Sequence, residues 1–262
     1  MKQYTLADDA RPQVSLLLAA SGVSLALWIV SWFIPFAGYI VYPLQLFATF
    51  IHEGGHVLAA LLSGGSVASL TVSPDTSGEV FSSTGGWLSQ LFVSSAGYLG
   101  TTAFGAALLA WMRYGFSARL GLLISAAIVA VLTVFFGFLA PIFSLFQSVT
   151  FGGFLFTLFS GAVLAVGLAA IAKYANLKWA NFAFAFLAVQ CLLNAVFSLL
   201  ELVLITSLTD AHSDAANMAA ATGIPALVWA LLWIIVSVVM ISIGLRVYAV
   251  SRRTRTDSVF VD

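Results

Sequence analysis

About seven apolar runs, each long enough to cross a lipid bilayer as a helix, limit the fold of this chain more than any other sequence feature. A helix needs about twenty apolar residues to span the hydrocarbon core. Only 8% of the 262 residues are charged and 61% are hydrophobic, which leaves too little polar surface for a soluble domain. We therefore expect an all-α, polytopic transmembrane helical bundle. The runs cover residues 14–34, 39–63, 86–111, 119–141, 148–172, 178–207 and 223–250, and the fourth and fifth could be divided differently around Pro141.

The runs follow one another closely, so we expect a single integral-membrane domain over residues 1–262. Short polar tails are expected at 1–13 and 251–262. The first run is longer than the apolar core of a signal peptide, about 7–15 residues, and we interpret it as a signal anchor or a plain first helix. The single cysteine, Cys191, excludes an intramolecular disulfide. No basic patch indicates a nucleic-acid partner.

Basic residues are found at alternate connections between the runs. The connections near 66–85, 142–147 and 208–222 contain no Lys or Arg, which by the positive-inside rule places them outside and the C-terminus in the cytoplasm. Lys2 and Arg11 fit this orientation badly, because seven spans would leave the N-terminus outside. The basic residues that set the orientation are Arg113, Arg119, Lys173, Lys178, Arg246, Arg252, Arg253 and Arg255.

The stretch FATFIHEGGHVLAALLSGG, residues 47–65, places three ionisable side chains inside an apolar run. His52 and His56 are four residues apart, so on a helix they lie on one face and can bind one ion at the roughly 2.0–2.1 Å that zinc prefers. Glu53 lies beside them and can act as the general base on water without binding the metal. The alternative is a pair of buried histidines that neighbouring side chains satisfy, but ionisable groups at membrane depth usually have a function. The pattern favours a zinc site.

A catalytic zinc usually has a third protein ligand, often a carboxylate. Glu201 shares a polar helix face with Gln190, Asn194 and Ser198, because the four positions fall within an arc of about 80°. This stripe must face protein or water rather than lipid. It predicts Asn194 and Glu201 as part of the wall of an active-site cavity, with hydrogen bonding between helices as the alternative.

Asp214 is the other candidate for the third ligand. Its alternative role is structural, since Ser213 could cap a short helix and an acid in the first turn would complement the helix dipole. His212 is interpreted as a loop residue. The four acids closest to the chain ends are expected to be solvated tail charges: Asp8, Asp9, Asp257 and Asp262.

With these residues in view, the chain resembles the site-2 protease family of intramembrane zinc metallopeptidases, specifically its compact branch without a PDZ domain. The resemblance covers nearly the whole chain after the first run. It rests on HEGGH at 52–56, AGYLG at 96–100, VQCLLNA at 189–195 and SDAANMAAATGIPALVWALLW at 213–233. The last of these is specific to the compact branch, whereas the first occurs in many zinc peptidases. The glycines at 96–105 are otherwise explained by close helix packing.

The resemblance implies a Zn²⁺-dependent protease in which His52 and His56 bind the metal and Glu53 is the base. It also implies an aspartate from a later helix as the third ligand. Better-known relatives supply this aspartate in an L-D-G motif, which this chain lacks. We interpret the S-D-A stretch as its counterpart, so the expected ligand is Asp214, with Glu201 in reserve.

The segment from 64 to 86 predicts a β-hairpin, because two short alternating runs flank a Pro-Asp-Thr-Ser-Gly turn. A plain loop is the alternative. A hairpin edge could pair with an unwound substrate segment and expose its peptide bonds to the zinc. Relatives typically open their site toward the cytosol, whereas the charge pattern here places the hairpin on the opposite side.

These observations predict an intramembrane zinc metalloprotease that hydrolyses peptide bonds of membrane-embedded protein or peptide substrates. The expected partners are the substrate and the lipid bilayer. The alternative is a catalytically silent membrane protein, either a zinc-stabilised scaffold or a metal carrier. Glu53 argues against a pure carrier, because metal binding alone needs only the ligands.

Overall fold

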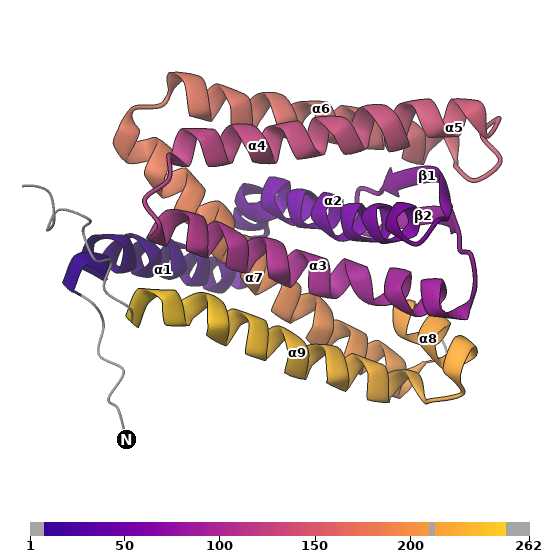
Figure 1. The fold of residues 1–262 in the computed structure, drawn as a ribbon. Helices are drawn as coiled ribbons and strands as arrows, with labels where there is room; N and C mark the ends of the chain where they lie inside the picture. The colour runs from indigo at the N-terminus through magenta and orange to yellow at the C-terminus, as the bar shows by residue number, and fades with distance from the viewer. Residues whose placement is uncertain (1–7, 210–212, 250–262) are drawn as a thin grey trace, which may run out of the picture.

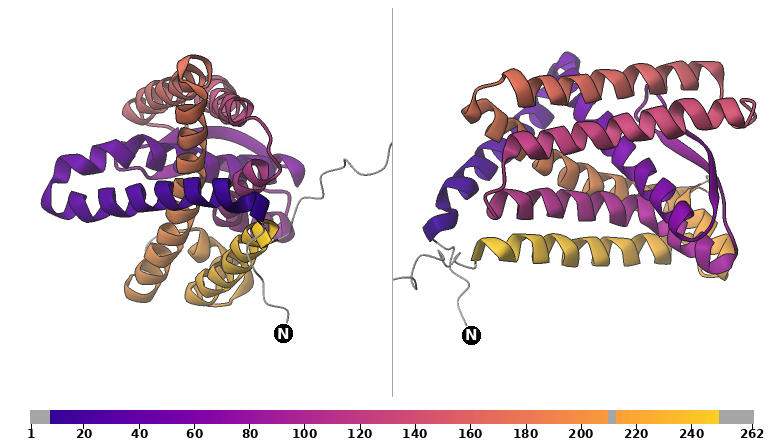
Figure 2. Two further views of the ribbon diagram at one scale, coloured as in Figure 1. Left: turned by 90° about the vertical axis from the view of Figure 1, so that its left-hand side faces the viewer. Right: turned by 45° about the horizontal axis from the view of Figure 1, so that its top comes forward.

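Long helices form the body of the protein, some side by side and others crossing them obliquely, and one β-hairpin is inserted between the second and third of them (Figures 1 and 2). The computed structural model describes residues 8–209 and 213–249. The described architecture confirms the predicted all-α membrane bundle with a hairpin after the second apolar run. The helices are α1 (Arg11–Phe33), α2 (Gly38–Leu62), α3 (Trp87–Arg113), α4 (Ala118–Val131), α5 (Ala140–Phe143), α6 (Phe151–Tyr174), α7 (Leu177–Leu208), α8 (Asp214–Thr222) and α9 (Ala226–Arg246).

Each predicted apolar run coincides with one helix to within a few residues. The fourth run is a continuous helix from Ala118 to Phe143 whose middle, Leu132–Leu139, is π-helical, and Pro141 lies in the first turn of α5 without dividing the helix. Five helices in the described part of the chain are long and apolar enough to cross a membrane: α3, the Ala118–Phe143 helix, α6, α7 and α9. The protein is therefore an integral membrane protein.

Polar side chains fix where several helices begin. Each accepts a hydrogen bond from a backbone N–H in the first turn, which satisfies a donor that the helix itself leaves unpaired. Asn176 does this for α7, Thr150 for α6 and Ser117 for α4. Ser213 caps α8 in the same way, and Gly223 ends that helix in the left-handed conformation. The short helix that Ser213 was expected to cap is thus present.

The helices α1 and α2 meet at a corner that lies part-way along the bundle, as two of the views show (Figures 1 and 2). The start of α1 lies at the same end of the bundle as the last turn of α3, and the end of α2 lies at the opposite end, beside the hairpin (Figure 1). Asp9 marks the first of these ends, because its carboxylate accepts hydrogen bonds from Nη2 of Arg113 at 3.0 and 3.1 Å. The N-terminal turn and the last turn of α3 therefore lie at the same end of the bundle.

This contact corrects the expectation that Asp9 is a solvated tail charge. Arg113 is 1% exposed, and a buried guanidinium requires a carboxylate partner. Of the predicted N-terminal tail, residues 8–10 form a 3-10 turn and Arg11 begins α1. Residues 1–7 and the predicted C-terminal tail, 251–262, lie outside the described part of the chain.

The hairpin consists of β1 (Ser66–Val72) and β2 (Gly78–Ser83), paired antiparallel. Asp75 closes its turn, because Oδ1 accepts hydrogen bonds from both the hydroxyl and the N–H of Ser77, and these bonds lower the pKa of the carboxyl. Two side chains of α2 hold the turn: the Tyr42 hydroxyl donates to the Pro74 carbonyl and the Thr49 hydroxyl to that of Thr76. The predicted hairpin is confirmed, and it lies along α2.

Candidate metal centre

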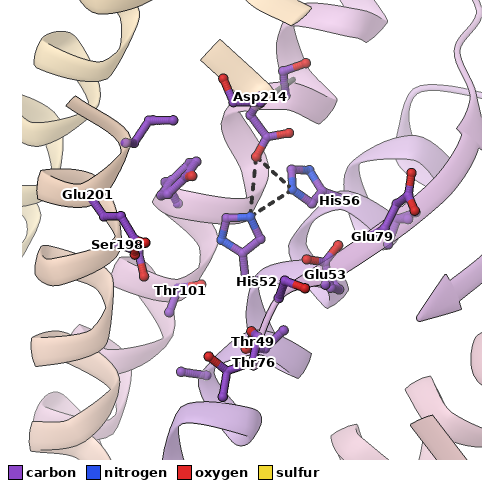
Figure 3. Close-up of a pocket in the computed structure, with 18 of the residues that line it drawn as sticks. Thr49, His52, Glu53, His56, Thr76, Glu79, Thr101, Ser198, Glu201 and Asp214 are labelled. Carbon is purple, nitrogen blue, oxygen red and sulfur yellow. Dashed lines mark hydrogen bonds and ion pairs between the residues drawn. The ribbon is translucent and has the colours of Figure 1, made fainter. Parts of the chain in front are cut away.

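The two histidines of α2 meet Asp214, the first residue of α8, at one point. Nε2 of His52 lies 3.1 Å from Nε2 of His56, and Oδ2 of Asp214 lies 3.4 Å from the first and 3.2 Å from the second (Figure 3). These three residues form a group whose ligand atoms could hold a metal ion. Glu201, the reserve candidate, is not part of the group, and Figure 3 shows it on a different helix across the cavity.

The spacing of the three atoms suits zinc. Ligands at 2.0–2.1 Å from a tetrahedral ion lie about 3.3–3.4 Å from one another, and the observed separations are 3.1–3.4 Å. Two imidazoles and one carboxylate are also a usual ligand set for a catalytic zinc, which keeps a fourth position for water. The donor set and its dimensions therefore fit the ion that the sequence predicts.

A backbone carbonyl fixes the protonation of His56. Nδ1 of this ring lies 2.7 Å from the carbonyl oxygen of Val93, and a carbonyl can only accept, so Nδ1 carries the proton and donates it. In the neutral ring, Nε2 then presents a lone pair toward His52 and Asp214. Three atoms with lone pairs facing one another repel unless a cation or a proton lies among them. The arrangement is thus that of a cation site.

Burial on one face positions the short helix that carries Asp214. Ala215 and Met218 are buried against Leu202 and Trp233, and α8 packs on α3 and α9 and touches α7, so that it presents Asp214 to α2. Burial alone would raise the pKa of the Asp214 carboxyl, whereas the two neighbouring imidazoles lower it. The ionised form of this carboxylate is the form that binds a metal ion.

Glu53 lies beside this group, on the side of the hairpin (Figure 3). Its side chain is only 4% exposed, although it belongs to the most polar turn of α2. Gly78, at the start of β2, packs so closely on it that a Cβ at that position would overlap the Glu53 carboxylate. Glu53 is therefore held between α2 and the hairpin, next to the three possible ligands but outside their group.

Two glycines make room for the histidines; the sequence interpretation gave Gly97 only a packing role and made no prediction for Gly55. Gly55 lets α2 approach the backbone of α3 at Ala96, where a Cβ would overlap the carbonyl. Gly97 lies directly against the site, because a Cβ there would overlap Nε2 of both His52 and His56. The stretch AGYLG thus shapes the metal centre as well as the contact between the helices. Val93, whose carbonyl orients His56, left no sequence signal.

Replacing Gly97 with alanine is expected to cost zinc affinity, because the added methyl group must displace at least one imidazole. Outer-shell changes at zinc sites typically lower affinity about 10–100-fold, and we expect a loss of at least this size. Gly100→Ala is the matched control on the same helix, since a Cβ there meets only Cα of Gly55 at 3.5 Å, an ordinary contact. Titration of each purified variant with a chromophoric zinc chelator measures the difference. Equal affinities for the two variants would contradict the assigned role of Gly97.

A cavity of about 890 Å³ surrounds the three possible ligands. Its walls come from α2, the hairpin, α3, α7 and α8, and they include Asn194 and Glu201. Asn194 also accepts a hydrogen bond from Ser198 one turn later, so part of the predicted polar stripe is bonded within α7. Tyr98 contributes an aromatic wall, with its ring 4.6 Å from that of His52 and stacked on Trp233 at 5.4 Å. His212 lies outside the described residues.

One edge of the hairpin faces the cavity. The outer edge of β1 is covered, because the Thr157 hydroxyl of α6 bonds both the N–H and the carbonyl of Val72. Successive residues of a strand direct their backbone groups to opposite edges, so Gly78, Val80 and Ser82 direct theirs away from β1. All three residues line the cavity. An extended segment could therefore pair with β2 beside the metal centre.

Comparison with known proteins gives one match. A family model described as Peptidase M50B-like matches residues 18–244, which run from within α1 to within α9 and include the hairpin. No curated protein and no solved structure matches the chain.

Proposed function

Since the chain belongs to the Peptidase M50B-like family, we propose that it is an intramembrane zinc metalloprotease that hydrolyses peptide bonds of membrane-embedded proteins. The observation that carries this proposal is the convergence of His52, His56 and Asp214 beside the buried Glu53. The family is one of metallopeptidases, and it agrees with the resemblance to site-2 proteases found in the sequence.

In this proposal His52, His56 and Asp214 hold the zinc ion. Zinc in such a site acidifies water and polarises the scissile carbonyl. Glu53 accepts the proton of the attacking water and later donates it to the leaving amine. Burial of Glu53 between α2 and Gly78 keeps its carboxylate beside the group rather than in bulk water. Asn194 and Glu201 belong to the cavity wall, where they contact the substrate.

The substrate binds in this proposal as an added strand on β2. An intact helix conceals its peptide bonds, so a membrane-spanning segment must unwind before hydrolysis. The backbone groups of Gly78, Val80 and Ser82 replace the hydrogen bonds that unwinding breaks. The described cavity wall contains the acidic residues of the hairpin and no Lys or Arg. Substrate segments that carry basic residues therefore meet no electrostatic repulsion there.

The C-terminus is cytoplasmic in this proposal. The basic residues at the described ends of helices support it, because α1 begins at Arg11 and α3 ends at Arg113 in the same end of the bundle, where α9 also ends at Arg246 (Figure 1). The pair of Asp9 and Arg113 supports the same orientation for the N-terminal turn, since Asp9 lies beside the basic end of α3. The hairpin and α8 then face the opposite side of the membrane.

Removal of metal tests the proposed function. Purified protein in phosphatidylcholine vesicles is expected to contain about one zinc per chain and to cleave at least one of a panel of membrane-spanning peptides with a fluorophore and a quencher. Treatment with 1,10-phenanthroline should abolish cleavage, and added zinc should restore it. Elemental analysis and mass spectrometry of the products provide the measurements. Cleavage that persists after the metal has been removed would refute the proposal.

A further inference from the structure

Glu53 is held in place by packing, because its carboxylate makes no hydrogen bond within the described residues although the side chain is buried. The contact that limits it comes from the backbone of β2, where a Cβ at Gly78 would overlap the carboxylate. A general base must lie within hydrogen-bond reach of the water that it activates. The position of β2 therefore decides where this carboxylate can lie.

Gly78 is placed in turn by its partner on β1, Val72. The N–H and carbonyl of Val72 bond outward to Thr157, so Val72 and Gly78 form a pair without mutual hydrogen bonds, which is the closer kind of pair in an antiparallel sheet. The next pair toward the turn is closed by a hydrogen bond of 2.9 Å from the N–H of Ser73 to the carbonyl of Ser77. A shift of Val72 is therefore transmitted to Gly78.

The Thr157 hydroxyl of α6 holds the outer edge of β1. It accepts a hydrogen bond of 2.8 Å from the N–H of Val72, and its proton is shared between the carbonyl of Gly153 at 2.7 Å and that of Val72 at 3.3 Å. Thr157 and Val72 are both 0% exposed and α6 is a membrane helix, so water cannot replace these bonds. Loss of the hydroxyl would leave a buried N–H without a partner, which favours a shift of the strand.

Gly137 allows Thr157 to pack closely on the fourth apolar run. It belongs to the π-helical segment Leu132–Leu139, and a Cβ there would lie 3.0 Å from the methyl carbon of Thr157. Leu132 of the same segment packs against Gly54, the next residue after the base, where a Cβ would lie 2.8 Å from it. The segment thus supports both Thr157 and the turn of α2 that carries the base.

We propose that Thr157 is a positioning residue for the general base. Its hydroxyl fixes Val72, the strand pair then fixes Gly78, and Gly78 holds the Glu53 carboxylate beside the metal centre. This inference rests on the proposed protease function. Thr157 is neither one of the possible ligands nor part of the cavity wall, so its effect on cleavage passes through the hairpin.

Thr157→Val tests the role, because valine keeps the size of the side chain and removes the hydroxyl. We expect kcat for a membrane-spanning peptide in phosphatidylcholine vesicles to fall about tenfold, with KM and zinc content kept, and Thr157→Ser to restore kcat. Thr133→Val is the matched control, since this buried threonine bonds to the Val129 carbonyl of its own helix. Equal kcat for the two valine variants, a loss confined to KM, or no rescue by serine would overturn the proposal.

Chemical labelling separates this role from the protease function. Dicyclohexylcarbodiimide enters the vesicles and reacts with carboxyl groups in apolar surroundings, and mass spectrometry measures how much Glu53 is modified relative to the exposed Glu79. We expect severalfold more labelling of Glu53 in Thr157→Val and the wild-type amount in Thr157→Ser, because the cover over the carboxylate is loosened only in the first. This result in protein that cleaves no peptide would support the positioning role and count against the function alone. Unchanged labelling would overturn the positioning role.

Zinc content shows whether the variant has folded. If Thr157→Val contains no zinc, Thr157→Ala takes its place in both experiments, because alanine removes the same hydroxyl without placing a methyl group against the strand. Loss of zinc from both variants would overturn the proposal, since the proposed role concerns the base and not the ligands.

Discussion

Replacing Glu53 with glutamine is expected to leave zinc bound and to abolish peptide cleavage. Glutamine has nearly the same shape as glutamate, and the group of possible ligands contains His52, His56 and Asp214 but not Glu53. An amide cannot accept the proton of the attacking water, and loss of a general acid–base lowers rates about 10²–10⁴-fold. Zinc content by elemental analysis and single-turnover cleavage of a membrane-spanning peptide are measured on the same preparation.

Glu79→Gln is the matched control, because it makes the same chemical change in the wall of the same cavity. It should keep both zinc and most of the cleavage. A Glu53→Gln variant that cuts at the wild-type rate would show that the proposed mechanism is wrong. If the wild type binds zinc but cleaves no peptide of the panel, the alternative of a zinc-stabilised scaffold or a metal carrier gains support.

Replacing Asp214 with asparagine is expected to cause the largest loss of zinc affinity among single changes at carboxylates of the cavity. Its Oδ2 lies 3.2 and 3.4 Å from the two imidazole nitrogens, as a shared ion requires. Asparagine keeps the size of the side chain but removes the negative charge, so the loss should exceed the roughly 10–100-fold that changes outside the ligands produce. Competition with a chromophoric chelator measures the affinity.

Glu201→Gln separates the two candidates for the third ligand. Glu201 lines the same cavity but is not part of the group of possible ligands, so this variant should bind zinc as the wild type does. The reverse result, with zinc lost from Glu201→Gln and kept by Asp214→Asn, would mean that α8 does not supply the ligand. Equal retention by both variants would exclude both Asp214 and Glu201 as the third ligand.

The parts of the structure that could be predicted from sequence are those that depend on local spacing. Each apolar run has the length of a membrane helix, and the Pro-Asp-Thr-Ser-Gly stretch has the composition of a turn, so the helices and the hairpin follow from short-range rules. The pair of His52 and His56 is also local, because four residues make one turn of helix. Position within the bundle is not needed for any of these predictions.

The remaining features depend on contacts between distant parts of the chain. The carbonyl that orients His56 belongs to Val93, and any residue has a carbonyl, so its side chain carries no signal. Gly97 could be seen as a packing glycine, but which side chains it admits depends on how α3 meets α2. Asp9 was wrongly expected to be solvated, because its partner Arg113 is far along the chain.

The aspartate of the metal centre is carried by a nine-residue helix rather than by one of the long spans. A helix of this length has almost no stability in isolation. The position of α8 therefore depends on the burial of Ala215 and Met218 and on the contacts that Asp214 makes at the metal centre. Occupancy of the ion and docking of α8 are then linked equilibria, and linkage is reciprocal. A partner that draws α8 away weakens metal binding by the same factor by which the ion opposes that partner.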